Sequence, residues 1–134
     1  MTAGLDHGRE RGLDRVLVVD DDPMQVELVE RGLSRDGFEV RGVTTVDEMA
    51  ILARQFAPDI LLIDVNMPDA SGERTIAMAR EAAPGARIVL YSAWEESKLR
   101  VLSAQLGADG FISKSDSVVA FGRRLREMQR GYRS

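Results

Sequence analysis

The stretch Val16-Leu17-Val18-Val19-Asp20-Asp21-Asp22 joins four consecutive apolar residues directly to three carboxylates. A strand without polar alternation is buried on both faces, as in the centre of a parallel sheet. A second continuous apolar run, Ile60-Leu61-Leu62-Ile63, also ends on a carboxylate, Asp64. Two buried strands that deliver carboxylates from the same ends build a negatively charged pocket, which is hard to maintain without a hard divalent cation. The two runs therefore suggest Mg²⁺ and phosphate chemistry.

The composition is that of a globular domain. The chain has 134 residues, 44% hydrophobic and 30% charged, which is enough for one domain with a hydrophobic core. It has no cysteine, which excludes disulfides, zinc-thiolate sites and cysteine nucleophiles. The first 15 residues contain no apolar core of a secretion signal, and no apolar run is long enough to span a membrane. We therefore expect a cytoplasmic protein without membrane contact, and the net charge of −4 argues against direct nucleic-acid binding.

From residue 15 onward, predicted strands alternate with predicted helices. The helix boundaries come from Asp22-Pro23 as N-cap and first residue, the capping box Thr45-x-x-Glu48, Pro84-Gly85 after a helix over about 73–83, and a stop at Gly107. Five successive strand–helix units predict an α/β fold: a doubly wound five-stranded parallel sheet with helices on both faces. Because the second strand alternates like an edge strand, we expect the flavodoxin-like order 2-1-3-4-5. Residues 1–14 are predicted to be a flexible extension, 15–130 the domain and 131–134 a tail.

Polar side chains follow four of the predicted strands. Ligands of such folds bind at the carboxyl ends of the strands. There Asp20 and Asp21 can hold Mg²⁺ beside Asp64, which can be a metal ligand, a nucleophile or a loop residue. Lys114 supplies a compact positive charge, and Ser92 supplies a hydroxyl. Two alternatives come from helix capping: Asp22 is better explained as an N-cap, and Ser92-x-x-Glu95 is itself a capping box, so Ser92 has two equally good interpretations.

Four spaced motifs resemble those of response-regulator receiver domains. They are the run Val-Leu-Val-Val-Asp-Asp-Asp-Pro at 16–23, Asp-Val-Asn-Met-Pro at 64–68, Leu-Tyr-Ser-Ala at 90–93, and Gly-Ala-Asp-Gly-Phe-Ile-Ser-Lys at 107–114. Each motif alone is weak, but together they are highly specific. The resemblance covers about residues 14 to 130.

The resemblance implies a role for each matched residue. Asp64 would be phosphorylated by a sensor histidine kinase or a phosphotransfer protein. Mg²⁺ would be bound by Asp20, Asp21, Asp64 and the backbone carbonyl of Asn66, and Lys114 would pair with the phosphoryl group. Ser92 would move toward the phosphate and Phe111 would turn inward behind it. These movements would switch the surface of the fourth helix, fifth strand and last helix toward an unknown output partner.

The resemblance also implies a signalling switch rather than an enzyme, one that at most catalyses its own phosphotransfer and autodephosphorylation. By analogy with the family alone, the resemblance also implies a phosphorylation-dependent homodimer through the last two helices.

The chain departs from the family pattern at three positions. Ser115 follows the lysine where the family usually has a proline in a cis bond, and a cis bond before serine would cost about 2.5–4 kcal/mol. The switch aromatic is Phe111, which lacks a tyrosine hydroxyl. Trp94 is bulky and lies two residues after Ser92. We hypothesise that Trp94 shields the acyl phosphate from water and lengthens its lifetime.

Two other functions compete with the receiver interpretation. Asp20-x-Asp22 after a strand resembles the nucleophile and acid/base pair of haloacid-dehalogenase-type phosphohydrolases, but the chain lacks a late acidic pair and leaves Asp64 without a role. A degenerate receiver that acts only as a binding module would usually have lost an acidic ligand, the acceptor or the lysine, and all are present here. The motifs leave open whether the chain is a stand-alone receiver or a fragment of a longer protein, and which kinase it serves.

Overall fold

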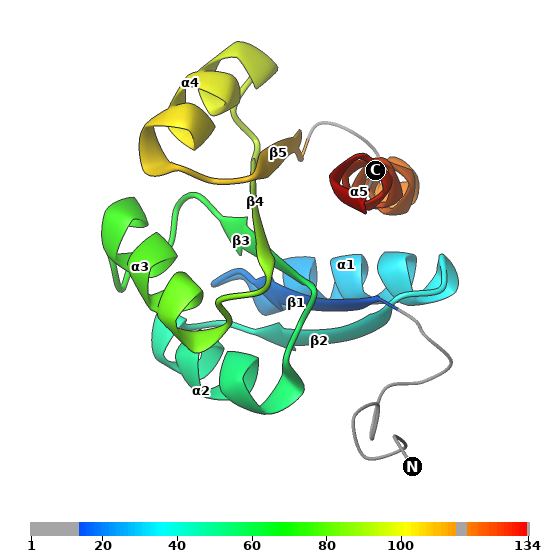
Figure 1. The fold of residues 1–134 in the computed structure, drawn as a ribbon, viewed down its shortest axis with the longest axis horizontal. Helices are drawn as coiled ribbons and strands as arrows, with labels where there is room; N and C mark the ends of the chain where they lie inside the picture. Colours follow the sequence, from blue (N-terminus) through cyan, green and yellow to red (C-terminus); the bar gives the residue numbers. More distant parts are fainter. Residues whose placement is uncertain (1–13, 115–117, 134) are drawn as a thin grey trace.

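The computed structural model describes residues 14–114 and 118–133, and in this part of the chain strands and helices alternate (Figure 1). The strands are β1 (Arg15–Val19), β2 (Glu39–Val43), β3 (Ile60–Asp64), β4 (Arg87–Ser92) and β5 (Gly110–Ser113). The helices are α1 (Pro23–Arg35), α2 (Val46–Phe56), α3 (Gly72–Ala82), α4 (Glu96–Leu106) and α5 (Val118–Arg133).

All the strands lie parallel in one sheet, in the order β2-β1-β3-β4-β5. This confirms the predicted doubly wound sheet and its strand order. The register places Val19 of β1 beside Ile63 of β3, and Asp64 beside Tyr91 of β4. The carboxyl ends of the three central strands therefore lie side by side, as a site built from strand ends requires.

The helices cover both faces of the sheet and divide the core into two clusters (Figure 1). On one face, Val16 and Val18 pack with residues of α1 and α5, among them Leu33 and Phe121. On the other face, Leu17 and Val19 pack with residues of α2 and α3. Successive residues of β1 thus point to opposite faces and both sets are buried, which is why the strand is apolar throughout.

The predicted helix starts are confirmed at α1 and α2. Asp22 caps α1 by accepting a hydrogen bond from the N–H of Met24, and Thr45 caps α2 through the N–H of Glu48. Asp22 is therefore a helix cap, as its sequence context favours. Helix α3 starts at Gly72, one residue before the predicted start, because Ser71 caps it through the N–H of Arg74.

The last helix ends beyond residue 130, the predicted end of the domain. Helix α5 continues to Arg133, through residues assigned to a tail. At the other end, the carbonyl of Asp14 accepts a hydrogen bond from the N–H of Glu39, so the backbone bonding to β2 begins before Arg15. The flexibility predicted for residues 1–13 lies outside the described residues. Among the helices in the described ranges, none is both long and apolar enough to cross a membrane.

Candidate functional site

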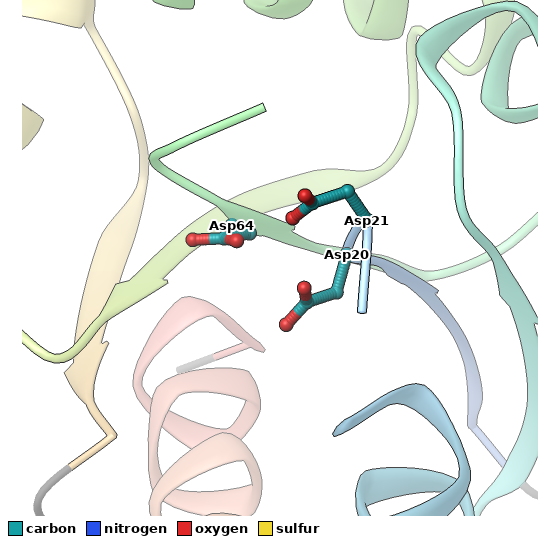
Figure 2. A group of neighbouring side chains, drawn as sticks. All are labelled: Asp20, Asp21 and Asp64. Carbon is teal, nitrogen blue, oxygen red and sulfur yellow. The ribbon is translucent and has the colours of Figure 1, made fainter. Parts of the chain in front are cut away.

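Three carboxylates meet at the ends of β1 and β3 (Figure 2). Asp20 and Asp21 follow β1, and Asp64 is the last residue of β3. Each offers a carboxylate oxygen within 4.8 Å of the others. Asp20 and Asp64 are buried, whereas Asp21 is exposed at the mouth of the site. The sheet thus brings together residues that are 44 positions apart in the sequence.

The backbone continues the sheet hydrogen bonding beyond the strand ends and so fixes where the site residues lie. The N–H of Asp20 donates to the carbonyl of Val43 at 3.2 Å, and the N–H of Lys114 donates to the carbonyl of Ser92 at 2.6 Å. Asp20 therefore extends β1 alongside β2, and Lys114 extends β5 alongside β4, so neither is a free loop residue.

Asp20 is held by three donors. Its Oδ2 accepts hydrogen bonds from the hydroxyl of Tyr91 at 2.6 Å and from Nζ of Lys114 at 3.1 Å. Its Oδ1 accepts a hydrogen bond from the N–H of Asp22 at 3.0 Å. A buried carboxylate is costly unless it is paired and hydrogen-bonded, and these contacts meet that requirement.

Lys114 also reaches the second buried carboxylate. Its Nζ lies 3.5 Å from Oδ1 of Asp64, and the N–H of Asn66 donates to the same oxygen at 3.2 Å. The ammonium group therefore lies between Asp20 and Asp64, where Lys114 was predicted to supply a positive charge. The bond between Lys114 and Ser115, where the family's proline is replaced, lies outside the described residues.

The pKa values of the two buried carboxylates are shifted in opposite directions, downward for Asp20 and upward for Asp64. Burial raises the pKa of Asp20, but hydrogen bonds from Tyr91, Asp22 and Lys114 outweigh it and leave the pKa below its ordinary value. Burial also raises the pKa of Asp64, and the nearby charge of Asp20 adds to that rise. The Asn66 N–H and the charge of Lys114 offset it only in part, so the pKa of Asp64 stays above its ordinary value.

The donor set fits Mg²⁺. The three carboxylates, set against the single ammonium of Lys114, leave this group of four side chains with an excess of negative charge. Mg²⁺ prefers oxygen ligands, keeps several waters and needs few protein oxygens. The residues that could hold it are Asp20, Asp21 and Asp64, as the sequence predicts. The backbone N–H of Asn66 donates a hydrogen bond to Asp64, which places Asn66 beside these carboxylates.

The structure shows that the capping-box interpretation of Ser92 is wrong. The N-cap of α4 is Glu95, which makes no side-chain capping bond. The hydroxyl of Ser92 instead accepts a hydrogen bond from the N–H of Trp94 at 3.1 Å. Ser92 is fully buried at the end of β4, one residue beyond Tyr91, which is the register neighbour of Asp64.

Phe111 and Trp94 lie on the α4 side of the site. Phe111 is half-buried, and the guanidinium carbon of Arg100 lies 5.2 Å from the centre of its ring. Trp94 is 40% exposed. With Val65 and Asn66 it lines a cavity of about 510 Å³ between the loop after Asp64 and helix α4. Trp94 is thus placed beside the loop that its predicted shielding role requires.

Sequence reasoning missed Tyr91. It was quoted within a matching motif but given no role, although its hydroxyl reaches Asp20 across 71 residues of sequence. The available signal was a tyrosine in an otherwise apolar strand, because a buried tyrosine hydroxyl usually needs a partner. Arg100 was missed as well, since nothing in the helical pattern relates it to Phe111.

Comparisons with known proteins agree with this fold. The family model "Response regulator receiver domain" matches residues 16–121. The chain belongs to the response regulator receiver family, in which Mg²⁺ binding and phosphorylation are typical. It is therefore a domain of two-component signalling rather than a classical enzyme.

Curated relatives extend the comparison to whole proteins. The transcriptional regulatory protein MctR of Rhizobium johnstonii is 33% identical over 110 residues, which are 81% of this chain and 51% of that protein. The transcriptional regulatory protein PrrA of Mycobacterium tuberculosis is 31% identical over 116 residues, which are 87% of this chain and 50% of that protein. The chain thus spans about half the length of the curated relatives it matches.

Solved structures share the fold. The chemotaxis response regulator CheY4 of Vibrio cholerae superimposes with a TM-score of 0.76 at 22% identity, covering 87% of this chain and 98% of that one. A response regulator from Thermotoga maritima gives a TM-score of 0.74 at 25% identity, covering 87% and 97%.

Proposed function

We propose that the chain is a phosphoacceptor switch of a two-component phosphorelay, and that Asp64 is the residue phosphorylated. The observation that carries this proposal is the position of the Lys114 ammonium between Asp20 and Asp64. An anion can approach the anionic phosphoryl group only if the charges between them are neutralised. A lysine beside the acceptor and a metal-binding set of carboxylates supply that neutralisation.

In the proposed reaction, a carboxylate oxygen of Asp64 attacks the phosphorus of a phosphohistidine. The new oxygen–phosphorus bond forms as the phosphorus–nitrogen bond breaks, and the imidazole is the leaving group. Asp20, Asp21, Asp64 and the carbonyl of Asn66 would hold Mg²⁺, which supplies charge neutralisation for the phosphoryl oxygens. Lys114 would pair with those oxygens, and the Ser92 hydroxyl would donate to one of them.

The proposed output follows from the charge that phosphorylation adds. A phosphoryl group brings up to two negative charges and strong acceptor oxygens to a site lined by Ser92 and Lys114. Movement of Ser92, followed by Phe111, would change the surface of α4, β5 and α5. We propose that this surface controls a partner or an output domain, and that a sensor histidine kinase or phosphotransfer protein supplies the phosphoryl group. The transcriptional roles named for MctR and PrrA are consistent with such an output.

The two competing functions lack support in the structure. For a phosphohydrolase, Asp20 would have to be the nucleophile, but its Oδ2 already accepts hydrogen bonds from Tyr91 and Lys114 and its Oδ1 accepts one from the N–H of Asp22. Asp22, the would-be acid/base, caps α1. A binding module without phosphorylation would not need the metal-binding carboxylates and the lysine together.

Intact-mass measurement tests the proposed function. The protein is incubated with acetyl phosphate and Mg²⁺, and we expect a mass gain of one phosphoryl group that is lost in Asp64→Asn and when the metal is chelated. Asp47→Asn, at an exposed position in the first turn of α2, is the matched control and should be phosphorylated normally. A gain that persists in Asp64→Asn but not in Asp20→Asn would support the phosphohydrolase, and no gain would support the binding module.

A further inference from the structure

Tyr91 connects the core of the domain to the carboxylate site. It is fully buried in β4, and its ring packs edge-on against Phe121 of α5, with 6.3 Å between ring centres. Its hydroxyl donates to Oδ2 of Asp20 at 2.6 Å. Its side chain therefore lies on the α1/α5 face of the sheet, whereas Ser92, the next residue, follows on the alternate side.

The hydroxyl of Tyr91 limits how the Asp20 carboxylate can turn. Each carboxylate oxygen has two lone pairs. Both lone pairs of Oδ2 are used, by Tyr91 and Lys114, whereas Oδ1 accepts a single hydrogen bond among those described, from the N–H of Asp22. Oδ1 therefore keeps a lone pair that can bind a cation. The three contacts fix the rotation of the carboxylate group before any metal arrives.

Unlike Lys114, Tyr91 cannot turn its side chain away from Asp20. Lys114 is shared with Asp64, lies 4.6 Å over the Tyr91 ring and is partly exposed, so it can turn toward a phosphoryl group. The Tyr91 ring is enclosed in the core by its contact with Phe121. When Lys114 turns away, Tyr91 is the side-chain donor that still holds Oδ2 of Asp20.

We infer that Tyr91 is a positioning residue for metal binding: its hydroxyl holds the Asp20 carboxylate in the orientation that presents Oδ1 to Mg²⁺. This inference rests on the proposed function, since it assigns Mg²⁺ to the Asp20–Asp64 site. It makes a claim that core packing alone does not, because phenylalanine would fill the same space equally well. Hydrogen bonds to metal-binding side chains are typically worth a 10- to 100-fold change in metal affinity.

The test compares Tyr91→Phe with the wild type by titrating MgCl₂ at constant ionic strength. Two readouts are independent of activity: the fluorescence of Trp94, which is the chain's single tryptophan, and the rise in melting temperature with Mg²⁺. We expect the dissociation constant for Mg²⁺ to rise about tenfold in Tyr91→Phe. With acetyl phosphate, the Mg²⁺ concentration at half-maximal rate should rise by the same factor, while the rate at saturating Mg²⁺ changes much less.

Phe121→Leu is the matched control, because it loosens the packing of the Tyr91 ring without removing the hydroxyl. It should lower the melting temperature of the metal-free protein and leave the dissociation constant for Mg²⁺ unchanged. An unchanged or lower dissociation constant in Tyr91→Phe would overturn the inference, as would an equal rise in Phe121→Leu. If the wild type binds no Mg²⁺ and Asp64 accepts no phosphoryl group, the proposed function fails instead, so the two failures are distinguishable.

Discussion

The Nζ atom of Lys114 lies 3.1 Å from Oδ2 of Asp20, so the residue that follows β5 neutralises the carboxylate that follows β1. Each comes from a different strand, and the pair is mostly buried. An ammonium in this position takes part of the role that a divalent cation would fill. Under the proposed function, Lys114 and Mg²⁺ would compete for the charge of Asp20 before phosphorylation, and they would both pair with the phosphoryl oxygens afterwards.

The variant Lys114→Gln separates the effect of Lys114 on metal binding from its effect on phosphoryl transfer. Without the ammonium, the carboxylates repel one another more strongly, so we expect a lower melting temperature without metal and a larger rise on adding Mg²⁺. A hydrogen bond to a charged group contributes about 1.5–3 kcal/mol, which sets the expected loss of stability. Phosphorylation of Asp64 by acetyl phosphate should slow by about 100-fold, because a preorganised cation is lost from the transferring group.

The matched control for this experiment is Lys98→Gln. Lys98 and Lys114 are the two lysines of the chain, and Lys98 is exposed on α4. Its replacement should change neither the Mg²⁺ response nor the phosphorylation rate. Normal phosphorylation of Lys114→Gln would show that Lys114 only balances charge in the metal-free protein and has no part in phosphoryl transfer.

Asp64→Asn should stabilise the metal-free protein in a pH-dependent way. The pKa of Asp64 is raised in the folded state, so its contribution to stability is complete below the unfolded pKa and is lost as pH rises through the folded pKa. Asparagine does not ionise and avoids this loss. We expect the melting temperature of Asp64→Asn at pH 7 to exceed that of the wild type, and each 1 kcal/mol of added stability would raise it by about 3–5 °C in a domain of this size.

Thermal melts in the presence of a chelator from pH 3.5 to pH 8 test how the stability difference between Asp64→Asn and the wild type changes with pH. The higher melting temperature of Asp64→Asn should approach that of the wild type as pH falls toward the ordinary aspartate pKa of about 4. In that range the wild-type carboxyl is protonated in the folded state and, like asparagine, carries no charge. Mg²⁺ should stabilise the wild type more than the variant. If the variant is less stable than the wild type at pH 7, the ion pair of Asp64 with Lys114 stabilises the folded protein more than burial of the ionised carboxylate destabilises it.

The order and placement of the strands could be predicted because short-range patterns determine them. Continuous apolar runs marked β1 and β3 as central strands, and their terminal carboxylates predicted which ends would meet. The site contacts made by side chains distant in sequence could not be predicted in the same way. The bond from Tyr91 to Asp20 depends on the two side chains pointing to the same face of the sheet, and nothing in the strand's apolar pattern specifies the partner.

Ser92 shows a second limit of sequence reasoning. A serine three residues before a glutamate fits a capping box and a strand-end hydroxyl equally well. The choice depends on where α4 begins, which is set by how the chain leaves β4. Helix α4 begins at Glu96, so Ser92 stays with the strand and its hydroxyl bonds the N–H of Trp94.

Trp94→Ala should shorten the lifetime of the phosphorylated protein. Trp94 lines the cavity beside Val65 and Asn66, and its removal opens the loop after Asp64 to water. We expect the dephosphorylation rate to rise several-fold, measured as the loss of phosphoryl mass after the donor is removed. Trp94→Phe keeps an apolar ring and should give a rate closer to the wild type. Equal rates in all three proteins would show that Trp94 does not shield the phosphate.

Gly122→Ala should destabilise the contact between α1 and α5. A Cβ at residue 122 would overlap a carboxylate oxygen of Asp36 and lie 2.9 Å from its Cβ, so the two helices would have to move apart. Overpacking of this kind costs about 1–3 kcal/mol in free energy of unfolding, measurable by urea denaturation. Gly85→Ala is the control, because a Cβ there meets nothing within 4 Å. Equal stability of the two variants would contradict the close helix contact.

Arg100→Ala should favour the activated state, because Arg100 holds Phe111 from outside. The guanidinium of Arg100 lies over the Phe111 ring and is paired with Glu96 at 2.7 Å, and this contact is lost if Phe111 turns inward. An exposed cation–π contact is worth about 0.5–1 kcal/mol, so its removal should strengthen binding of the phosphoryl analogue beryllofluoride about two- to fivefold. Titration of Trp94 fluorescence measures this affinity. Glu96→Gln leaves the guanidinium over the ring and should have a smaller effect, whereas an unchanged affinity in Arg100→Ala would show that Phe111 does not move against Arg100 on activation.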